Sequence, residues 1–185
     1  MNHHFMLDIE TWGKQPYSVI IALGAVHFNP NVVGEIFSRF YVAIDPVSAQ
    51  KAGLRIDADT VAWWMNPEQR AALDRWFSEL KLELPMALDG FTQWLDVEAP
   101  EIKERMIWGN GASFDNMLLA NAYQAVNEEQ PWKYYGDRCF RTMKNLIGAR
   151  DIAPPIEGTA HHALDDAVQQ ARWLQNIIYQ NNIAF

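Results

Sequence analysis

The sequence contains few of the features that mark secreted or membrane proteins. Its 185 residues include a single cysteine, Cys139, so that no disulfide can form within the chain. No apolar run reaches the roughly 18 residues that a membrane-spanning helix requires. The first residues lead directly into a strand pattern, without the apolar core of a signal peptide. We therefore expect a cytoplasmic location.

Basic residues are also scarce, since 15 Lys and Arg stand against 23 Asp and Glu, for a net charge of −8. Surfaces that bind nucleic-acid duplexes are usually basic, and this charge argues against long, tight duplex binding. No linker, repeat or low-complexity segment divides the chain, and its 49% hydrophobic content suffices for one buried core. We expect a single domain spanning residues 1–185.

The first acidic motif lies in the apolar segment from Phe5 to Glu10. On a strand, side chains alternate between faces, so Asp8 and Glu10 share one face while Leu7 and Ile9 occupy the other. Two carboxylates on one buried face persist when protons or a cation neutralise them, and Mg²⁺ or Mn²⁺ would do so. The alternative is a solvated strand end with no function.

The second motif follows a predicted strand at Met106–Trp108. A turn at Gly109-Asn110-Gly111 leads into a helix with Ser113 as its expected N-cap and Asp115 in its first turn. Open α/β sheets bind ligands at the carboxyl ends of their strands, where Asp115 would lie. The alternative is that Asp115 only complements the helix dipole, which contributes about 0.3 to 1 kcal/mol.

The third motif opens the last predicted helix, from about His162 to Asn181. Two histidines and two aspartates compete for roles here. Helix geometry alone pairs His162 with Asp166 at i, i+4. A helical pair of this kind is commonly an ordinary surface pair, and the residues alone do not select between His161 and His162.

Together these motifs resemble the DEDDh branch of the DnaQ-like 3′-5′ exonucleases. The family pattern has DxE after an apolar run, Nx₃FD opening a helix and HxxxxD opening the final helix. It is matched in order by Asp8-Ile9-Glu10, by Asn110 to Phe114-Asp115 and by His161 to Asp166. The resemblance spans nearly the whole chain. Other segments, Thr60 to Trp64 and Asp137 to Thr142, look like phage exonucleases of the exonuclease VIII and DexA kind and a related exoribonuclease group.

The resemblance implies two divalent cations, Mg²⁺ or Mn²⁺, at the four carboxylates. Asp8, Glu10 and Asp166 would bind one ion, with Asp8 bridging to a second ion held by Asp115 or its waters. His161 would be the general base. Bound ions lower the pKa of water and stabilise both oxygens of an in-line displacement, and a histidine with a pKa near 6.5 can accept the proton. No covalent intermediate is needed, so we expect Cys139 to be a small, partly buried residue and not a nucleophile.

The expected activity is 3′-5′ hydrolysis of single-stranded nucleic acid, with DNA slightly favoured over RNA, releasing nucleoside 5′-monophosphates. A non-catalytic interaction module that kept the fold is the alternative, and the intact carboxylate set argues against it. The two metal ions would also cancel four of the negative charges. By analogy with relatives, we expect a homodimer.

Several further residues are expected to bind substrate. Trp12 could stack on a terminal base or simply pack, and Arg138 and Arg141 could hold a phosphate or pair with Asp137. The expected substrate-binding set is Thr11, Trp12, Asn110, Phe114 and Arg138.

The resemblance implies an α/β fold of the RNase H-like kind, with a mixed five-stranded sheet flanked by helices. The hydrophobic pattern predicts strands at Phe5–Glu10, Ser18–Phe28, Gly34–Ile44 and Met106–Trp108. It predicts helices at Asp59–Met65, Pro67–Leu82, Pro85–Leu95, Phe114–Val126, Thr142–Ala149 and His162–Asn181.

Overall fold

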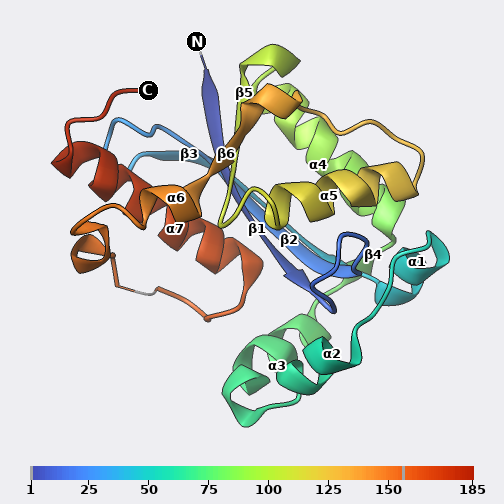
Figure 1. The fold of residues 1–185 in the computed structure, drawn as a ribbon. Helices are drawn as coiled ribbons and strands as arrows, with labels where there is room; N and C mark the ends of the chain where they lie inside the picture. Colours follow the sequence, from blue (N-terminus) through green and yellow to red (C-terminus); the bar gives the residue numbers. More distant parts are fainter. Residues whose placement is uncertain (1, 156) are drawn as a thin grey trace.

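The chain is built on one mixed β-sheet. A computed structural model describes residues 2–155 and 157–185, in which six strands lie in the order β4-β3-β2-β1-β5-β6 (Figure 1). The β1–β2 and β2–β3 pairs are antiparallel, whereas β1–β5, β5–β6 and β3–β4 are parallel. The strands are β1 (His3–Thr11), β2 (Ile20–Phe28), β3 (Ile36–Ile44), β4 (Lys81–Leu82), β5 (Arg105–Gly109) and β6 (Asp137–Cys139).

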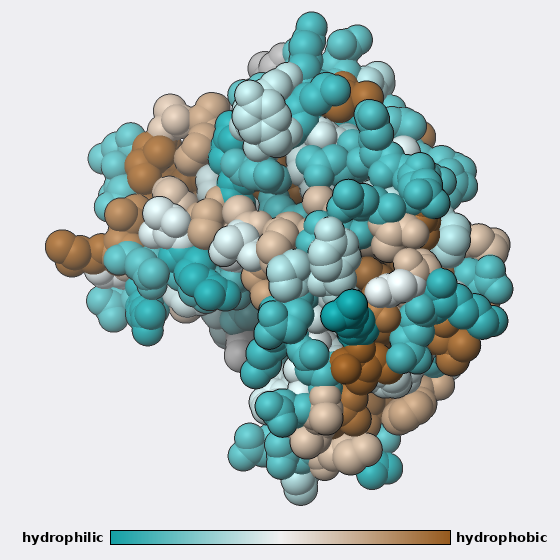
Figure 2. Space-filling view, turned by 45° about the vertical axis from the view of Figure 1, so that its right-hand side comes forward, coloured by the Kyte–Doolittle hydropathy of each residue, from teal (hydrophilic) through white to brown (hydrophobic). Residues whose placement is uncertain are grey.

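Helices cover both faces of this sheet (Figure 1). The α-helices are α1 (Pro46–Lys51), α2 (Ala58–Trp64), α3 (Arg70–Ser78), α4 (Leu84–Glu98), α5 (Asp115–Ala125), α6 (Phe140–Met143) and α7 (Ala163–Gln180), and the short 3₁₀ segments are Pro67–Gln69, Ile102–Glu104, Tyr134–Gly136 and Ala149–Ile152. None of the helices within the described residues combines the length and apolar character that crossing a membrane requires. Hydrophilic side chains predominate on the face shown in Figure 2, and the hydrophobic ones form separate patches.

Strand β1 separates two hydrophobic layers because its side chains alternate between the faces of the sheet. Phe5 and Leu7 pack in the cluster that includes Phe91 of α4 and Leu119 of α5. Met6 belongs instead to the cluster formed with α7. The strand therefore presents the Met6 face, and with it Asp8 and Glu10, towards α7.

Gly24 allows α7 to begin directly against the sheet. It lies opposite Asp8 in the β1–β2 register. A Cβ atom built at Gly24 would come within 2.3 Å of the backbone of Ala163 and Leu164, so a larger residue would push away the start of α7. This close approach brings the third sequence motif beside the first.

The α/β class and the four predicted strands are confirmed, but the sheet has six strands instead of five. The predicted helix Pro67–Leu82 is wrong at its end, because α3 stops at Ser78 and β4 follows. The ammonium of Lys81 donates to the carbonyl oxygens of Trp76, Phe77 and Glu79, which satisfies the open C-terminal end of α3. Lys81 then pairs with Ala43 at the edge of the sheet.

Two other local predictions are wrong, and one helix was missed. Helix α5 begins at Asp115 after Phe114, and Ser113 is not its N-cap. The predicted helix Thr142–Ala149 is replaced by the short α6 and by a 3₁₀ segment that begins after Gly148, whose φ is 75°. Helix α1 was not predicted, although Asp45 caps it by accepting hydrogen bonds from two backbone amides of its first turn.

Candidate active site

The three sequence motifs meet in one cavity of about 230 Å³. Asp8 and Glu10 come from β1, Asp115 is the first residue of α5, and Asp166 lies in the first turn of α7. All four carboxylates and His161 line the cavity, together with Asn110, Phe114, Arg141 and Gln170. Residues separated by more than 150 positions in sequence thus share one concave site.

Burial and mutual repulsion disfavour the charged form of these carboxylates. Burial, followed by the charges of Asp115 and Asp166, raises the pKa of Asp8 well above its ordinary value. The pKa of Glu10 is raised in the same way, by burial and then by Asp8 and Asp166. Burial raises the pKa of Asp115 to about 7 and also raises that of Asp166. Such a cluster is stabilised by either protons or cations.

The donor set fits divalent cations that prefer oxygen ligands. Asp115 Oδ2 is buried and has no hydrogen-bond partner among the described residues, which leaves it available to an ion. One ligand atom each from Glu10, His161 and Asp166 lies within 4.8 Å of the others. Carboxylate oxygens at this density are the ligands that Mg²⁺ and Mn²⁺ prefer.

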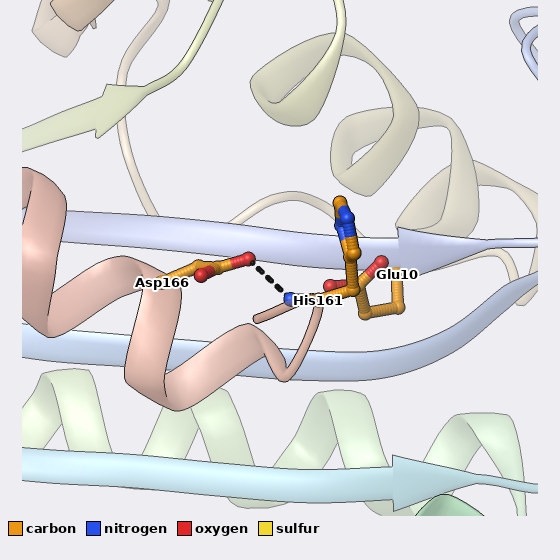
Figure 3. A group of neighbouring side chains, drawn as sticks. All are labelled: Glu10, His161 and Asp166. Carbon is orange, nitrogen blue, oxygen red and sulfur yellow. Dashed lines mark hydrogen bonds between the residues drawn. The ribbon is translucent and has the colours of Figure 1, made fainter. Parts of the chain in front are cut away.

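His161 lies beside Glu10 and Asp166, just before α7 (Figure 3). It adopts a φ of 61°, which turns the chain sharply into the helix. Its backbone N–H donates to Asp166 Oδ2 at 3.1 Å. Its ring packs edge-on against Trp63, with the centroids 5.0 Å apart. The side chain is therefore partly open and close to the carboxylates.

His162 occupies a different environment, although it is the next residue. Its side chain is 4% exposed and its ring stacks on Tyr41 at 4.4 Å. Its two ring nitrogens lie 3.4 Å from Glu79 and 3.5 Å from Asp165, and it does not line the carboxylate cavity. The two histidines are thus separated by the fold in a way that helix geometry alone does not predict.

Gln170 is a site residue that the sequence reasoning did not identify. It lies one turn after Asp166 on α7 and donates from Nε2 to Asp8 Oδ1 at 2.8 Å. It is buried, and the hydrogen bond holds one carboxylate oxygen of Asp8 in a fixed orientation. The i, i+4 spacing from Asp166 is the sequence signal that points to it.

The expected substrate-binding residues lie in different places. Asn110 and Phe114 line the carboxylate cavity. Thr11 lines a neighbouring pocket of about 180 Å³, and its hydroxyl donates to the carbonyl of Gly13 at 2.7 Å. Trp12 packs against Trp76 with the ring centroids 5.5 Å apart and lines neither cavity, which favours the packing alternative.

Arg138 also lies away from both cavities. Its guanidinium donates to the carbonyls of Tyr135 and Asp137. The carboxylate of Asp137 accepts from Asn116 and Trp132 instead, so the expected pairing of Arg138 with that carboxylate is not formed. Arg141 is the arginine that lines the carboxylate cavity.

The cluster of four acids with a histidine is the arrangement that the resemblance to the DEDDh exonucleases predicts. A family model for the 3′-5′ exoribonuclease Rv2179c-like domain matches residues 3–178, and the chain belongs to this family. The exodeoxyribonuclease of Enterobacteria phage T4 is 23% identical over 191 residues, which cover 89% of this chain and 84% of the phage protein.

Solved structures show the same fold. Exonuclease I superposes with a TM-score of 0.68 at 14% identity, over 99% of this chain and 42% of that chain. This chain therefore spans less than half of exonuclease I. The nuclease domain of 3′hExo, a DEDDh family member bound to rAMP, superposes with a TM-score of 0.65 at 16% identity, over 98% of this chain and 94% of that domain.

Proposed function

We propose that this domain is a two-metal-dependent 3′-5′ exonuclease that acts on single-stranded ends and releases nucleoside 5′-monophosphates. The observation that carries the proposal is the convergence of Asp8, Glu10, Asp115, Asp166 and His161 on one cavity. A non-catalytic module would gain nothing from burying four acidic groups at the expense of stability.

Each residue has a role that follows from its position. Asp8, Glu10 and Asp166 would hold one cation, while Asp8 and Asp115 would hold the second. When bound, the cations supply Lewis acidity that activates water and stabilises both oxygens of the displacement. His161, at the open edge of the cluster, would accept the proton of the attacking water. Gln170 keeps Asp8 oriented through the 2.8 Å hydrogen bond.

The pocket beside Glu10 is suited to the terminal nucleoside. It is lined by Thr11, Thr60, Trp63 and Trp64 among others, and it adjoins the carboxylate cavity through Glu10 and Phe114. Trp63 is 37% exposed and offers a face for stacking on a base, an interaction of about 1 to 3 kcal/mol. In this arrangement Trp63 takes the stacking role that the sequence suggested for Trp12.

Both sugars remain candidates, and different observations favour them. DNA is favoured by the T4 exodeoxyribonuclease, which is similar along most of its length. RNA is favoured by the exoribonuclease-like family and by Thr60, a residue of the nucleoside pocket whose buried hydroxyl has no hydrogen-bond partner among the described residues. A ribose 2′-hydroxyl could satisfy such a group. Digestion of matched DNA and RNA oligonucleotides under the same conditions distinguishes the two.

The proposal is tested with 5′-labelled oligonucleotides, with and without Mn²⁺. We expect stepwise shortening and mononucleotide release that depend on the ion. Asp8→Ala or Asp166→Ala should abolish turnover while the fold survives, because each removes a metal ligand and relieves repulsion among the buried acids. Normal cleavage by either variant at saturating Mn²⁺ would contradict the assignment of the metal ligands. Light scattering would test the homodimer that the family resemblance implies.

A further inference from the structure

A group of cations lies beside the acidic site, on and after α6. Arg141 and Lys144 belong to this group, and Arg150 follows in the next 3₁₀ segment. None of these three residues takes part in an ion pair within the described chain, whereas Arg70, Arg75, Arg105 and Arg172 all do. Arg141 and Lys144 are instead attracted at longer range by the carboxylates of the site, so positive charge lies next to the active site of a protein with a net charge of −8.

Arg141 is held in place by the backbone of the second motif. Its Nε and Nη2 atoms both donate to the carbonyl of Asn110, at 3.1 and 2.6 Å. Its guanidinium lies over Gly111, where an added Cβ atom would be 3.4 Å away. Its Nη1 has no hydrogen-bond partner among the described residues, although Arg141 lines the carboxylate cavity. The guanidinium is thus fixed in position with one donor group still available.

Lys144, three residues after Arg141, adds positive charge near the same carboxylates. Its ammonium lies 5.6 Å from the ring centroid of Phe140 and 5.7 Å from that of Trp173, which are cation–π distances. It interacts electrostatically with Asp8 and Asp115, and repulsively with Arg141 and Arg150. A bound anion would relieve this repulsion between cations.

The two cavities define a direction for the substrate. The nucleoside pocket lies on the Glu10 side, and Arg141 lines only the carboxylate cavity. If the terminal nucleoside occupies the nucleoside pocket and the scissile phosphate lies at the carboxylates, the rest of the strand leaves past Asn110 and α6. The first phosphate on that path is the one on the 5′ side of the scissile bond.

We propose that Arg141, supported by Lys144, binds the phosphate immediately 5′ of the scissile phosphodiester. The inference rests on the proposed function, because it takes the exonuclease substrate as its ligand. It explains how an acidic protein can hold a single strand, since a local pair of cations replaces an extended basic surface. It also predicts a preference for substrates of at least three nucleotides, which carry this phosphate, over dinucleotides with a free 5′-hydroxyl, which lack it.

The test measures binding without cleavage. Labelled oligonucleotides carry a single neutral methylphosphonate at successive linkages, and their Kd is measured by fluorescence anisotropy in Ca²⁺. The variants are Arg141→Gln, Arg141→Lys and Lys144→Gln. The matched control is Lys103→Gln, which removes one exposed charge at the opposite end of β5. Release of mononucleotides in Mn²⁺ is measured separately and tests the proposed function.

We expect Arg141→Gln to weaken binding about tenfold. The slope of the binding constant against salt concentration, on logarithmic axes, should decrease by about the amount that one phosphate contact contributes. Lys144→Gln should have a smaller effect, Arg141→Lys should retain part of the affinity, and Lys103→Gln should bind like the wild type. A methylphosphonate at the linkage next to the scissile one should weaken binding to the wild type as much as Arg141→Gln weakens binding of the unmodified strand. The same methylphosphonate should not weaken binding to the Arg141→Gln variant further.

Two results would overturn the inference while leaving the nuclease assignment intact. One is that Arg141→Gln and the methylphosphonate next to the scissile linkage, when combined, weaken binding by the sum of their separate losses in binding free energy. The other, which does not depend on any variant folding, is a wild-type scan in which the linkage next to the scissile one matters no more than distant linkages. Tight binding without Mn²⁺-dependent release would instead refute the proposed function.

Discussion

Replacing Asp115 with asparagine should stabilise the metal-free protein while abolishing catalysis. The Asp115 side chain is buried at 3% exposure, and burial raises its pKa to about 7 from an ordinary value of 3.8. This difference corresponds to at most about 4 kcal/mol of destabilisation once the group is ionised in the folded state. Asparagine has nearly the same shape and no charge, so it removes this cost.

The sign of the effect follows from the two pKa values of Asp115. Below pH 3.8 the group is protonated in both the folded and the unfolded chain and contributes nothing. Between 3.8 and about 7 the unfolded chain releases the proton while the folded chain keeps it, so the free energy of unfolding falls as the pH rises. Above about 7 the full cost is present, and the gain from Asp115→Asn is largest there.

The assay is urea or thermal unfolding in EDTA at pH 4, 6 and 8. Because neighbouring acids share protons with Asp115, we expect about half of the maximum, roughly 2 kcal/mol at pH 8. For a chain of this size that is a rise in Tm of about 4 to 8 °C. Asp74→Asn, at an exposed carboxylate paired with Arg70, is the control and should change little. An equal or lower Tm for Asp115→Asn at pH 8, or a gain that is the same at all three pH values, would refute the reasoning.

Three further predictions concern catalysis and metal binding. His161→Ala should lower the rate by about 10² to 10⁴ with metal binding largely retained, and His162→Ala should stay within about tenfold of wild type; the opposite ranking would mean that the HxxxxD motif is misaligned here. Gln170→Ala should weaken Mn²⁺ binding in calorimetry about tenfold because Asp8 loses its orienting hydrogen bond, while Gln169→Ala should not; equal affinities would exclude this role for Gln170. Oligonucleotides with a 3′-phosphate should be degraded far more slowly than those with a free 3′-hydroxyl, and equal rates would rule out the 3′-5′ direction.

The sequence alone determined the chemical type of the site and most of the elements that carry it. The alternation around Asp8 and Glu10 placed both carboxylates on one face of a strand, and that arrangement is what β1 shows. Such patterns are local, because strand and helix periodicity depends on neighbouring residues. The positions of Asp115 and Asp166 at helix starts could be predicted for the same reason.

Only the tertiary structure decided which neighbouring residues reach the cavity. His161 and His162 are adjacent, yet the approach of α7 to Gly24 and the packing of His162 on Tyr41 send them to different environments. Arg141 faces the site and Arg138 does not, because their orientations depend on partners distant in sequence. The orientations of these side chains follow from the packing of whole elements against one another, which local sequence patterns do not predict.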